Sequence, residues 1–119
     1  MPRLSRIAAE LPADDMHAAL DFYEHKLGFQ VAMRMPSGEY AIVQRDGIAI
    51  HLFQDSSRKH SPVGIHIFTP DLEELRDELV SRGVNLSQDI RRKSWGNSDF
   101  RIKDDFGNEI KFTRPLPED

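Results

Sequence analysis

The sequence contains no cysteine. This absence excludes disulfides, thiolate zinc sites, iron–sulfur clusters and cysteine nucleophiles. Any metal site would have to use His, Asp, Glu or Gln, and five histidines leave such a site open. A chain without cysteine suits a reducing compartment, so we expect a cytoplasmic protein.

Long hydrophobic runs and an excess of basic residues are also absent. No apolar segment approaches the roughly 20 residues that a bilayer span needs, and residues 1–6 lack the apolar core of a signal peptide. The chain has 16 basic and 20 acidic residues, which gives a net charge of -4, and no long cationic block that could neutralise a phosphate backbone. We therefore expect neither a membrane nor a nucleic acid as partner.

The 119 residues, 39% hydrophobic and 30% charged, have the composition of one globular domain. Residues 4–11 predict a first strand that ends at Pro12. A helix follows, which Asp14 or Asp15 can cap and which Gly28 ends. Three strands are then predicted at 29–35, 39–45 and 48–53, with turns at 37–38 and 46–47.

The second half repeats this order after a polar linker at residues 55–61. A strand at 63–69 precedes a helix in which Asp71 and Glu74 form a capping-box pattern and Gly83 marks the end. The helix has an apolar stripe of Leu72, Leu75, Leu79 and Val80. Three more strands are predicted at 84–89, 99–103 and 109–113, followed by a frayed tail at 114–119.

The order strand, helix and three strands thus occurs twice. Asp15 and Asp71 lie 56 positions apart, and the turn glycines Gly47 and Gly107 lie 60 apart. Such internal duplication predicts an α+β fold of two tandem βαβββ modules, at about 3–54 and 62–114 of a single domain 1–119. Each helix covers one face of its mixed sheet, so the open, cupped faces must close on each other or on a partner chain.

Two stretches resemble a known superfamily. The sequence DDMHAALDFY at 14–23, followed by LGF at 27–29, resembles the start of the vicinal oxygen chelate proteins, which include glyoxalase I, fosfomycin resistance enzymes, extradiol dioxygenases and bleomycin resistance proteins. Trp95-Gly96 and Gly107-Asn108 in the second half resemble the bleomycin resistance proteins in particular. The resemblance implies a glyoxalase/bleomycin resistance-like fold and a homodimer that binds a small molecule.

The resemblance also locates four positions where metal-dependent relatives carry ligands. Ala8 and Gly64 stand where those enzymes carry His or Gln, and His51 and Lys111 stand where they often carry a carboxylate. Only His51 could coordinate a metal, and the Lys111 cation would repel one. The resemblance therefore implies a metal-free protein without a cofactor.

Strand alternation predicts which side chains face the cavity. On 48–53 these are Ala49, His51 and Phe53, and on 63–69 they are Gly64, His66 and Phe68. Phe53 and Phe68 would form apolar walls, and His51 and His66 would provide polar contacts. The alternative is that each histidine is merely hydrogen-bonded or solvated, and a register slip of one residue would turn both outward.

Trp95, the single tryptophan, lies in a glycine-containing turn, and we predict that it contacts the ligand. The alternative is that Trp95 is structural and packs as a lid on its own hairpin.

The bleomycin resistance proteins bind cationic antibiotics in acidic crevices, whereas residues 91–93, Arg101 and Lys111 are basic here. This departure favours an anionic or neutral ligand unless 91–93 is only a solvated loop.

No catalytic constellation is predicted. Asp104 and Asp105 have the pattern of an ordinary hairpin turn, Phe100 is expected in the core, and Tyr40 is a weaker site candidate.

We expect a homodimer that sequesters a small molecule, as in antibiotic resistance. Two alternatives remain open: a pure interaction protein, and a metal-dependent lyase, isomerase or dioxygenase that uses His51, His66 and Glu109 or Glu10.

Overall fold

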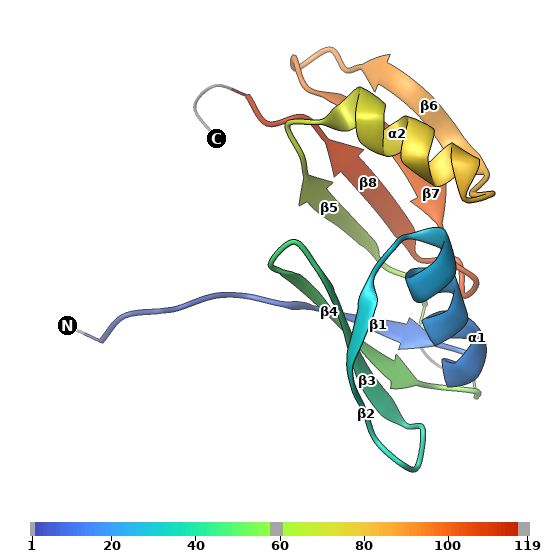
Figure 1. Ribbon diagram of the computed structural model, residues 1–119. Helices are drawn as coiled ribbons and strands as arrows, with labels where there is room; N and C mark the ends of the chain where they lie inside the picture. The colour runs from blue at the N-terminus through green and yellow to red at the C-terminus, as the bar shows by residue number, and fades with distance from the viewer. Residues whose placement is uncertain (1, 58–60, 117–119) are drawn as a thin grey trace.

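The computed structural model describes residues 2–57 and 61–116, and it confirms the predicted α+β fold of two modules, which lie one above the other in Figure 1. The first module contains β1 (Ala9–Ala13), α1 (Met16–Asp21), the π-helical turn η1 (Phe22–Lys26), β2 (Gln30–Arg34), β3 (Tyr40–Arg45) and β4 (Ile48–Gln54). The second contains β5 (Gly64–Phe68), α2 (Leu72–Ser81), β6 (Leu86–Arg92), β7 (Ser98–Lys103) and β8 (Glu109–Thr113). Residues 58–60 of the predicted linker and 117–119 of the predicted tail lie outside the described residues.

The two sheets have the same topology. Their strand orders are β1-β4-β3-β2 and β5-β8-β7-β6, and in each sheet one parallel pair joins the first and last strands of the module. In this register Glu10 lies opposite His51, and His66 lies opposite Lys111. The two pairs occupy equivalent places because they are related by the same separations of 56 and 60 positions that the sequence repeat shows.

The first helix begins and ends as predicted. The side chain of Asp15, rather than that of Asp14, accepts a hydrogen bond of 3.2 Å from the backbone nitrogen of Ala18. After η1 the chain turns at Gly28, whose φ of 75° is the left-handed conformation that glycine adopts without strain. The other three strands of the first module and the 46–47 hairpin turn are also confirmed.

The predicted first strand is wrong in its bounds. β1 runs through Pro12 to Ala13, which an edge strand tolerates because the missing N–H can face away from the ladder. The preceding segment is extended but pairs with no strand, and Leu4 and Ile7 are 97% and 96% exposed. In Figure 1 this segment projects away from both modules.

Four details of the second module also differ from expectation. The strand predicted at 84–89 is β6, Leu86–Arg92, because its last residues pair with the start of β7. The Asp71 side chain makes no capping hydrogen bond, and its backbone nitrogen instead donates to the Thr69 hydroxyl. Val80 is exposed, although Leu72 and Leu79 are buried as predicted. Arg114 is not frayed, because its backbone nitrogen donates to Ser98 and its guanidinium pairs with Glu73.

One hydrophobic core extends through both modules and includes Leu11, Ile50, Leu79 and Phe100. A buried polar network joins the modules beside it. The Tyr23 hydroxyl donates to the Asp104 carboxylate over 2.7 Å, and Asn108 donates to both Asp104, over 2.8 Å, and the Pro12 carbonyl, over 2.9 Å. Asp104 accepts hydrogen bonds within its hairpin turn, as expected, and the contact with Tyr23 adds a role that the sequence did not predict. We call Tyr23, Asp104 and Asn108 the inter-module clasp.

A salt bridge makes a second connection between the modules. Arg45, at the end of β3, donates to both carboxylate oxygens of Glu78 on α2, over 2.7 and 3.0 Å, and also to the Leu27 carbonyl. The hydrogen bond from Arg45 lowers the pKa of Glu78. Neither helix in the described part of the chain has the length and hydrophobicity that a membrane span requires.

Candidate functional site

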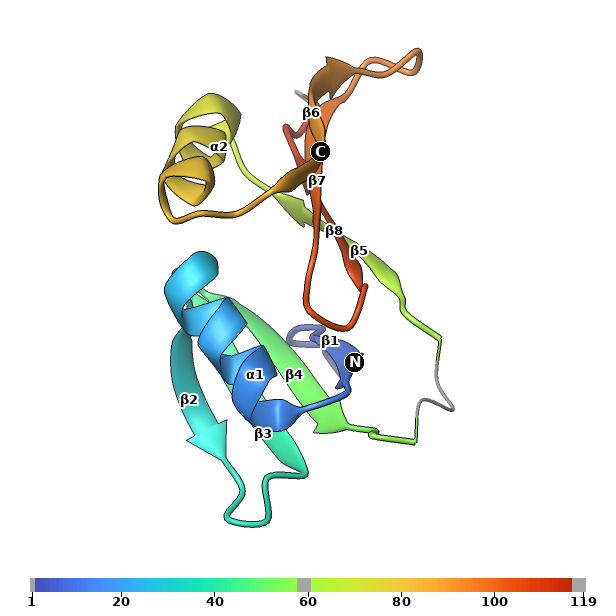
Figure 2. The same cartoon turned by 90° about the vertical axis from the view of Figure 1, so that its right-hand side faces the viewer.

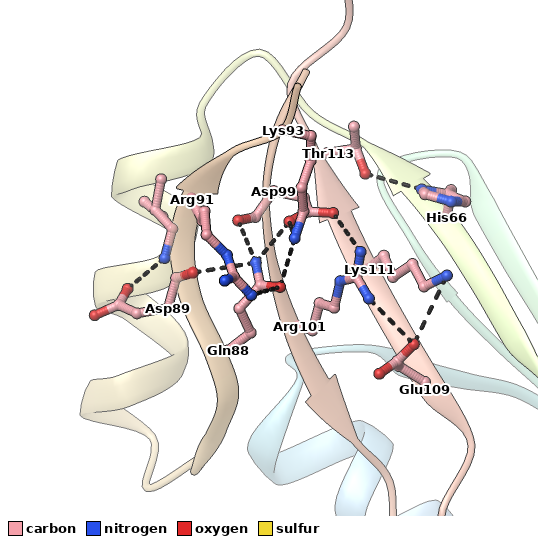
Figure 3. A network of polar contacts seen from close by, with 11 residues as sticks. His66, Gln88, Asp89, Arg91, Lys93, Asp99, Arg101, Glu109, Lys111 and Thr113 are labelled. Carbon is pink, nitrogen blue, oxygen red and sulfur yellow. Dashed lines mark hydrogen bonds and ion pairs between the residues drawn. The ribbon is translucent and has the colours of Figure 1, made fainter. Parts of the chain in front are cut away.

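The face of the second sheet opposite α2 is open and polar (Figures 2 and 3). Alternation buries Phe100, Ile102, Ile110 and Phe112 in the core and turns the intervening side chains to this face. Arg101 lies opposite Lys111, and Lys111 lies opposite His66, so three basic residues occupy neighbouring positions on β7, β8 and β5. We call His66, Lys111 and Arg101 the basic row.

Two carboxylates flank the basic row (Figure 3). Asp99 is buried and accepts hydrogen bonds from Gln88, over 2.7 Å, and from Arg101, over 3.3 Å, while Lys93 lies 3.6 Å away. Glu109 lies 3.8 Å from Arg101 and 3.7 Å from Lys111, which are ion-pair distances longer than a hydrogen bond. Asp99 is therefore tightly held, and Glu109 only loosely.

The protonation of this face follows from its charges. Burial raises the pKa of Asp99, but the hydrogen bond from Gln88 and the charges of Arg101 and Lys93 outweigh burial and leave that pKa below its ordinary value. Burial and then the Lys111 cation lower the pKa of His66 below its ordinary value of 6.5. His66 is thus neutral at neutral pH, within a positive environment.

Phe68 completes this part of the face. Its ring stacks on the His66 ring with centroids 6.1 Å apart and an angle of 21°, and its side chain is 54% exposed. Besides this ring contact, Nδ1 of His66 lies 3.0 Å from the Thr113 hydroxyl, within hydrogen-bond distance. An apolar platform therefore lies directly beside the basic row.

The open face of the first sheet carries a hydrogen-bonded chain of Glu10, Tyr40 and His51. The Tyr40 hydroxyl lies 2.7 Å from Glu10 and 2.8 Å from His51 Nδ1, and the hydrogen bond to Glu10 raises the pKa of Tyr40. Because a carboxylate only accepts, Tyr40 donates its one proton to Glu10, and His51 donates from Nδ1 to Tyr40. Neutral His51 then has an unprotonated Nε2, which can accept a proton.

The positions that correspond to metal ligands in related enzymes hold an unsuitable set of groups. Ala8 and Gly64 have no donor atom, and Lys111 presents an ammonium group beside His66. Across residues 2–57 and 61–116, no group of three or more His, Asp or Glu side chains is arranged to hold a metal ion. The side chains that are present on the second sheet are suited to anions rather than to cations.

Trp95 lies at the tip of the β6–β7 hairpin and is 67% exposed. The basic segment before it is not a solvated loop, since β6 extends to Arg92 and residues 91 and 93 enter the polar network of the open face. The Lys93 ammonium donates to Gln88 over 2.7 Å and is largely buried. The alternative reading of 91–93 as a solvated loop is therefore wrong for Lys93, whereas Arg91 is exposed but lies in β6 rather than in a loop.

A separate hollow of about 470 Å³ lies between α2 and the first module. Its lining includes the apolar side chains of Phe29, Ile48 and Leu75 and the Arg45–Glu78 salt bridge. Phe68 borders it as well. Sequence reasoning missed this hollow, because it arises where the two modules meet.

The structure brings together some of the predicted site residues and separates others. His66, Phe68, Arg101 and Lys111 share the open face of the second sheet, while His51 and Phe53 lie on β4 of the first. Sequence reasoning missed Asp99, and it named Glu10 and Tyr40 only as lesser candidates, without the hydrogen bonds that connect them to His51. The alternation of 40–45 could have placed Tyr40 on the open face, but its register with β4 is a long-range property.

A model of the Glyoxalase/Bleomycin resistance protein/Dioxygenase superfamily matches residues 3–112. Among solved structures, a bleomycin resistance determinant encoded on transposon Tn5 is 20% identical with a TM-score of 0.84, covering 93% of this chain and 98% of that chain. A bleomycin-binding protein complexed with bleomycin is 19% identical with a TM-score of 0.81, at coverages of 95% and 100%. Lactoylglutathione lyase from Agrobacterium tumefaciens is 20% identical with a TM-score of 0.76, at 95% of both chains.

At these identities the structural likeness establishes a shared fold. No curated protein sequence matches the chain significantly.

Proposed function

Since the chain belongs to the Glyoxalase/Bleomycin resistance protein/Dioxygenase superfamily, we propose that it is a metal-free protein that binds a small molecule on its open sheet faces and acts by sequestering it. The observation that carries this proposal is the open face of the second sheet. There a fixed polar network lies beside the exposed Phe68 ring, on the side that α2 leaves uncovered. A binding protein of the same fold, complexed with bleomycin, supports a small-molecule ligand.

The chemistry of the basic row supports the metal-free part of the proposal. Lys111 lies opposite His66, so a divalent cation that approached His66 would meet an ammonium group. Gly64 begins β5, the strand that also holds His66, and it has no side-chain atom that could coordinate a metal. Lys111 therefore disfavours the chemistry by which metal-dependent relatives act.

We further propose that two chains form a homodimer that closes these faces into cavities. Exposed apolar side chains support this, because a contact between chains would remove them from water. Leu4 and Ile7 project on the N-terminal segment, and Val31 and Met33 are exposed on the edge strand β2. The open faces of both sheets would then lie at or near the contact between chains.

Tryptophan fluorescence and sedimentation test the proposal together. Trp95 is the single tryptophan, so a ligand near the hairpin tip should quench or shift its emission. The panel includes bleomycin and cationic, neutral and anionic small molecules, and Trp95→Phe provides the blank. Saturable binding by a dimer supports the proposal. A monomer at micromolar concentration that binds no member of the panel, by calorimetry as well as fluorescence, contradicts it.

A second candidate is a metal-dependent enzyme of the same superfamily, a lyase, isomerase or dioxygenase. One observation favours it: Glu10 and His51 lie together on the first sheet and are connected through Tyr40. Elemental analysis of protein purified without chelator separates the two functions. Stoichiometric metal that is lost in His51→Ala would favour the enzyme.

A further inference from the structure

The register of the second sheet places two positive charges, those of Lys111 and Arg101, directly opposite one another, beside the neutral ring of His66. Lys111 on β8 has Arg101 on one side and His66 on the other. Like charges at opposite positions of neighbouring strands destabilise a sheet. A row of this kind therefore needs compensation by anionic groups, either within the protein or from a ligand.

The flanking carboxylates provide only part of this compensation. Three cations, Lys93, Arg101 and Lys111, face two carboxylates, Asp99 and Glu109. Asp99 already accepts hydrogen bonds from two side chains. Glu109 lies too far from either cation for a hydrogen bond, at 3.7 and 3.8 Å. Within this group of ion pairs one positive charge remains in excess.

Hydrogen-bond donors are in excess as well. Arg101 Nε is buried and has no hydrogen-bond partner among the residues that the structure describes. The Lys111 ammonium makes no hydrogen bond within the same residues, although its side chain is only 25% exposed. A buried donor without an acceptor, as Arg101 Nε is, indicates a missing acceptor.

We propose that the basic row binds the anionic group of a small organic ligand, a carboxylate or a phosphate, through Lys111 and Arg101. Arginine and lysine are the side chains that recognise such groups, and one anion would provide both the missing charge and the missing acceptors. Phe68, stacked on His66 beside the row, would hold an aromatic or apolar part of the same ligand. The preferred ligand class is therefore an aromatic or apolar organic anion. This inference rests on the proposed function in placing a small molecule on this face.

The test uses benzoate, inorganic phosphate and benzamidine as probes of the intact chain. Benzoate and benzamidine share a ring but have opposite charge, and phosphate has charge without a ring. Calorimetry measures affinity, and the ring signals of His66 in NMR spectra report the place of binding. We expect benzoate to bind more tightly than phosphate, and benzamidine not to perturb His66.

Matched variants test the role of the row. Lys111→Met should weaken benzoate binding at least tenfold, which is the effect of losing one charge-assisted hydrogen bond. Lys103→Met, which removes the same charge from an exposed position of the same sheet, should leave the affinity within about twofold. Arg101→Met should weaken binding too, but it also removes a partner of buried Asp99, so Lys111→Met is the deciding variant.

Three results would overturn the inference. One is equal binding of benzoate and benzamidine, and another is unchanged benzoate affinity in Lys111→Met. The third is that Lys111→Met converts a dimer to a monomer without affecting benzoate, because the row would then contact the partner chain. If a cationic or neutral molecule of the fluorescence panel binds while benzoate and phosphate fail, the proposed function stands and this inference alone fails.

Discussion

Replacing Tyr23 by Phe tests the inter-module clasp with the smallest change in shape. The substitution removes one hydroxyl group, whose hydrogen bond to Asp104 spans 2.7 Å in a fully buried place. Asp104 keeps three donors, at 2.8 to 3.0 Å: the side-chain amide of Asn108 and the backbone nitrogens of Phe106 and Asn108. Its carboxylate thus loses one of four hydrogen bonds and remains partly satisfied.

Removing a hydrogen bond to a charged group lowers the free energy of unfolding by about 1.5–3 kcal/mol. Because three donors still stabilise the Asp104 carboxylate, we expect a loss of about 2 kcal/mol. With a urea dependence of about 2 kcal/mol per molar for a domain of this size, the unfolding midpoint should fall by about 1 M. Tyr40→Phe is the matched control, because Tyr40 makes its hydrogen bonds on the open sheet face. There we expect a change below about 0.5 kcal/mol.

The same variant has a second signature at high pH. Burial, and then Asp104, raise the pKa of Tyr23 well above the 10.0 of an unfolded tyrosine. A raised pKa in the folded state gives stability that is present below pH 10 and is lost as the pH rises above it. Tyr23→Phe should therefore be less sensitive to alkali than the native chain. Equal midpoints for Tyr23→Phe and Tyr40→Phe, with the same alkaline profile as the native chain, would refute the clasp.

Three further predictions concern the backbone, the first sheet and the second sheet. In urea unfolding, Gly28→Ala should destabilise the chain by more than Gly38→Ala. Both glycines have positive φ, and the backbone strain of an alanine in that conformation costs about 1–2 kcal/mol at either position. Of the two, only Gly28 would also place a Cβ 2.9 Å from Nη1 of Arg45. Equal losses would contradict this reading. Nitrogen NMR should find neutral His51 protonated at Nδ1 and show that this preference weakens in Tyr40→Phe; identical tautomers in both proteins would disprove the hydrogen-bonded chain. The lowered pKa of Asp99 gives folding stability that is present above pH 3.8, its ordinary pKa, and is lost as the pH falls below that value. Asp99→Asn should therefore weaken the dependence of the unfolding free energy on pH in this acid range. An unchanged dependence would contradict the network.

Local patterns were sufficient for most of the fold. The helix that ends at Gly28, the hairpin around Gly47 and the alternation on 48–53 are short-range features, and the structure confirms them. The first strand was wrong because Pro12 indicates a strand end locally, whereas its place at a sheet edge depends on pairing with β4. The capping prediction at Asp71 failed for a similar reason, since the Thr69 hydroxyl takes its backbone N–H.

The candidate site was predictable only as far as alternation extends. Alternation assigned His51 and His66 to the open faces, but neither histidine's partner is near in sequence: Tyr40 lies on another strand, and Thr113 is 47 positions away from His66. The clasp was missed because Tyr23 and Asp104 are 81 positions apart. Only the pairing of strands and the packing of modules bring such residues together.

The clasp also makes the two halves of the duplication unequal. Two residues connect β3 to β4, whereas five residues, 104–108, connect β7 to β8, and this longer turn carries both Asp104 and Asn108. The first module provides only a hydroxyl and a carbonyl oxygen in return. A chain built from two copies of the first module would have no such turn, and a chain built from two copies of the second would lack the tyrosine that meets it. The halves have therefore diverged into two complementary parts of one contact, and neither can replace the other.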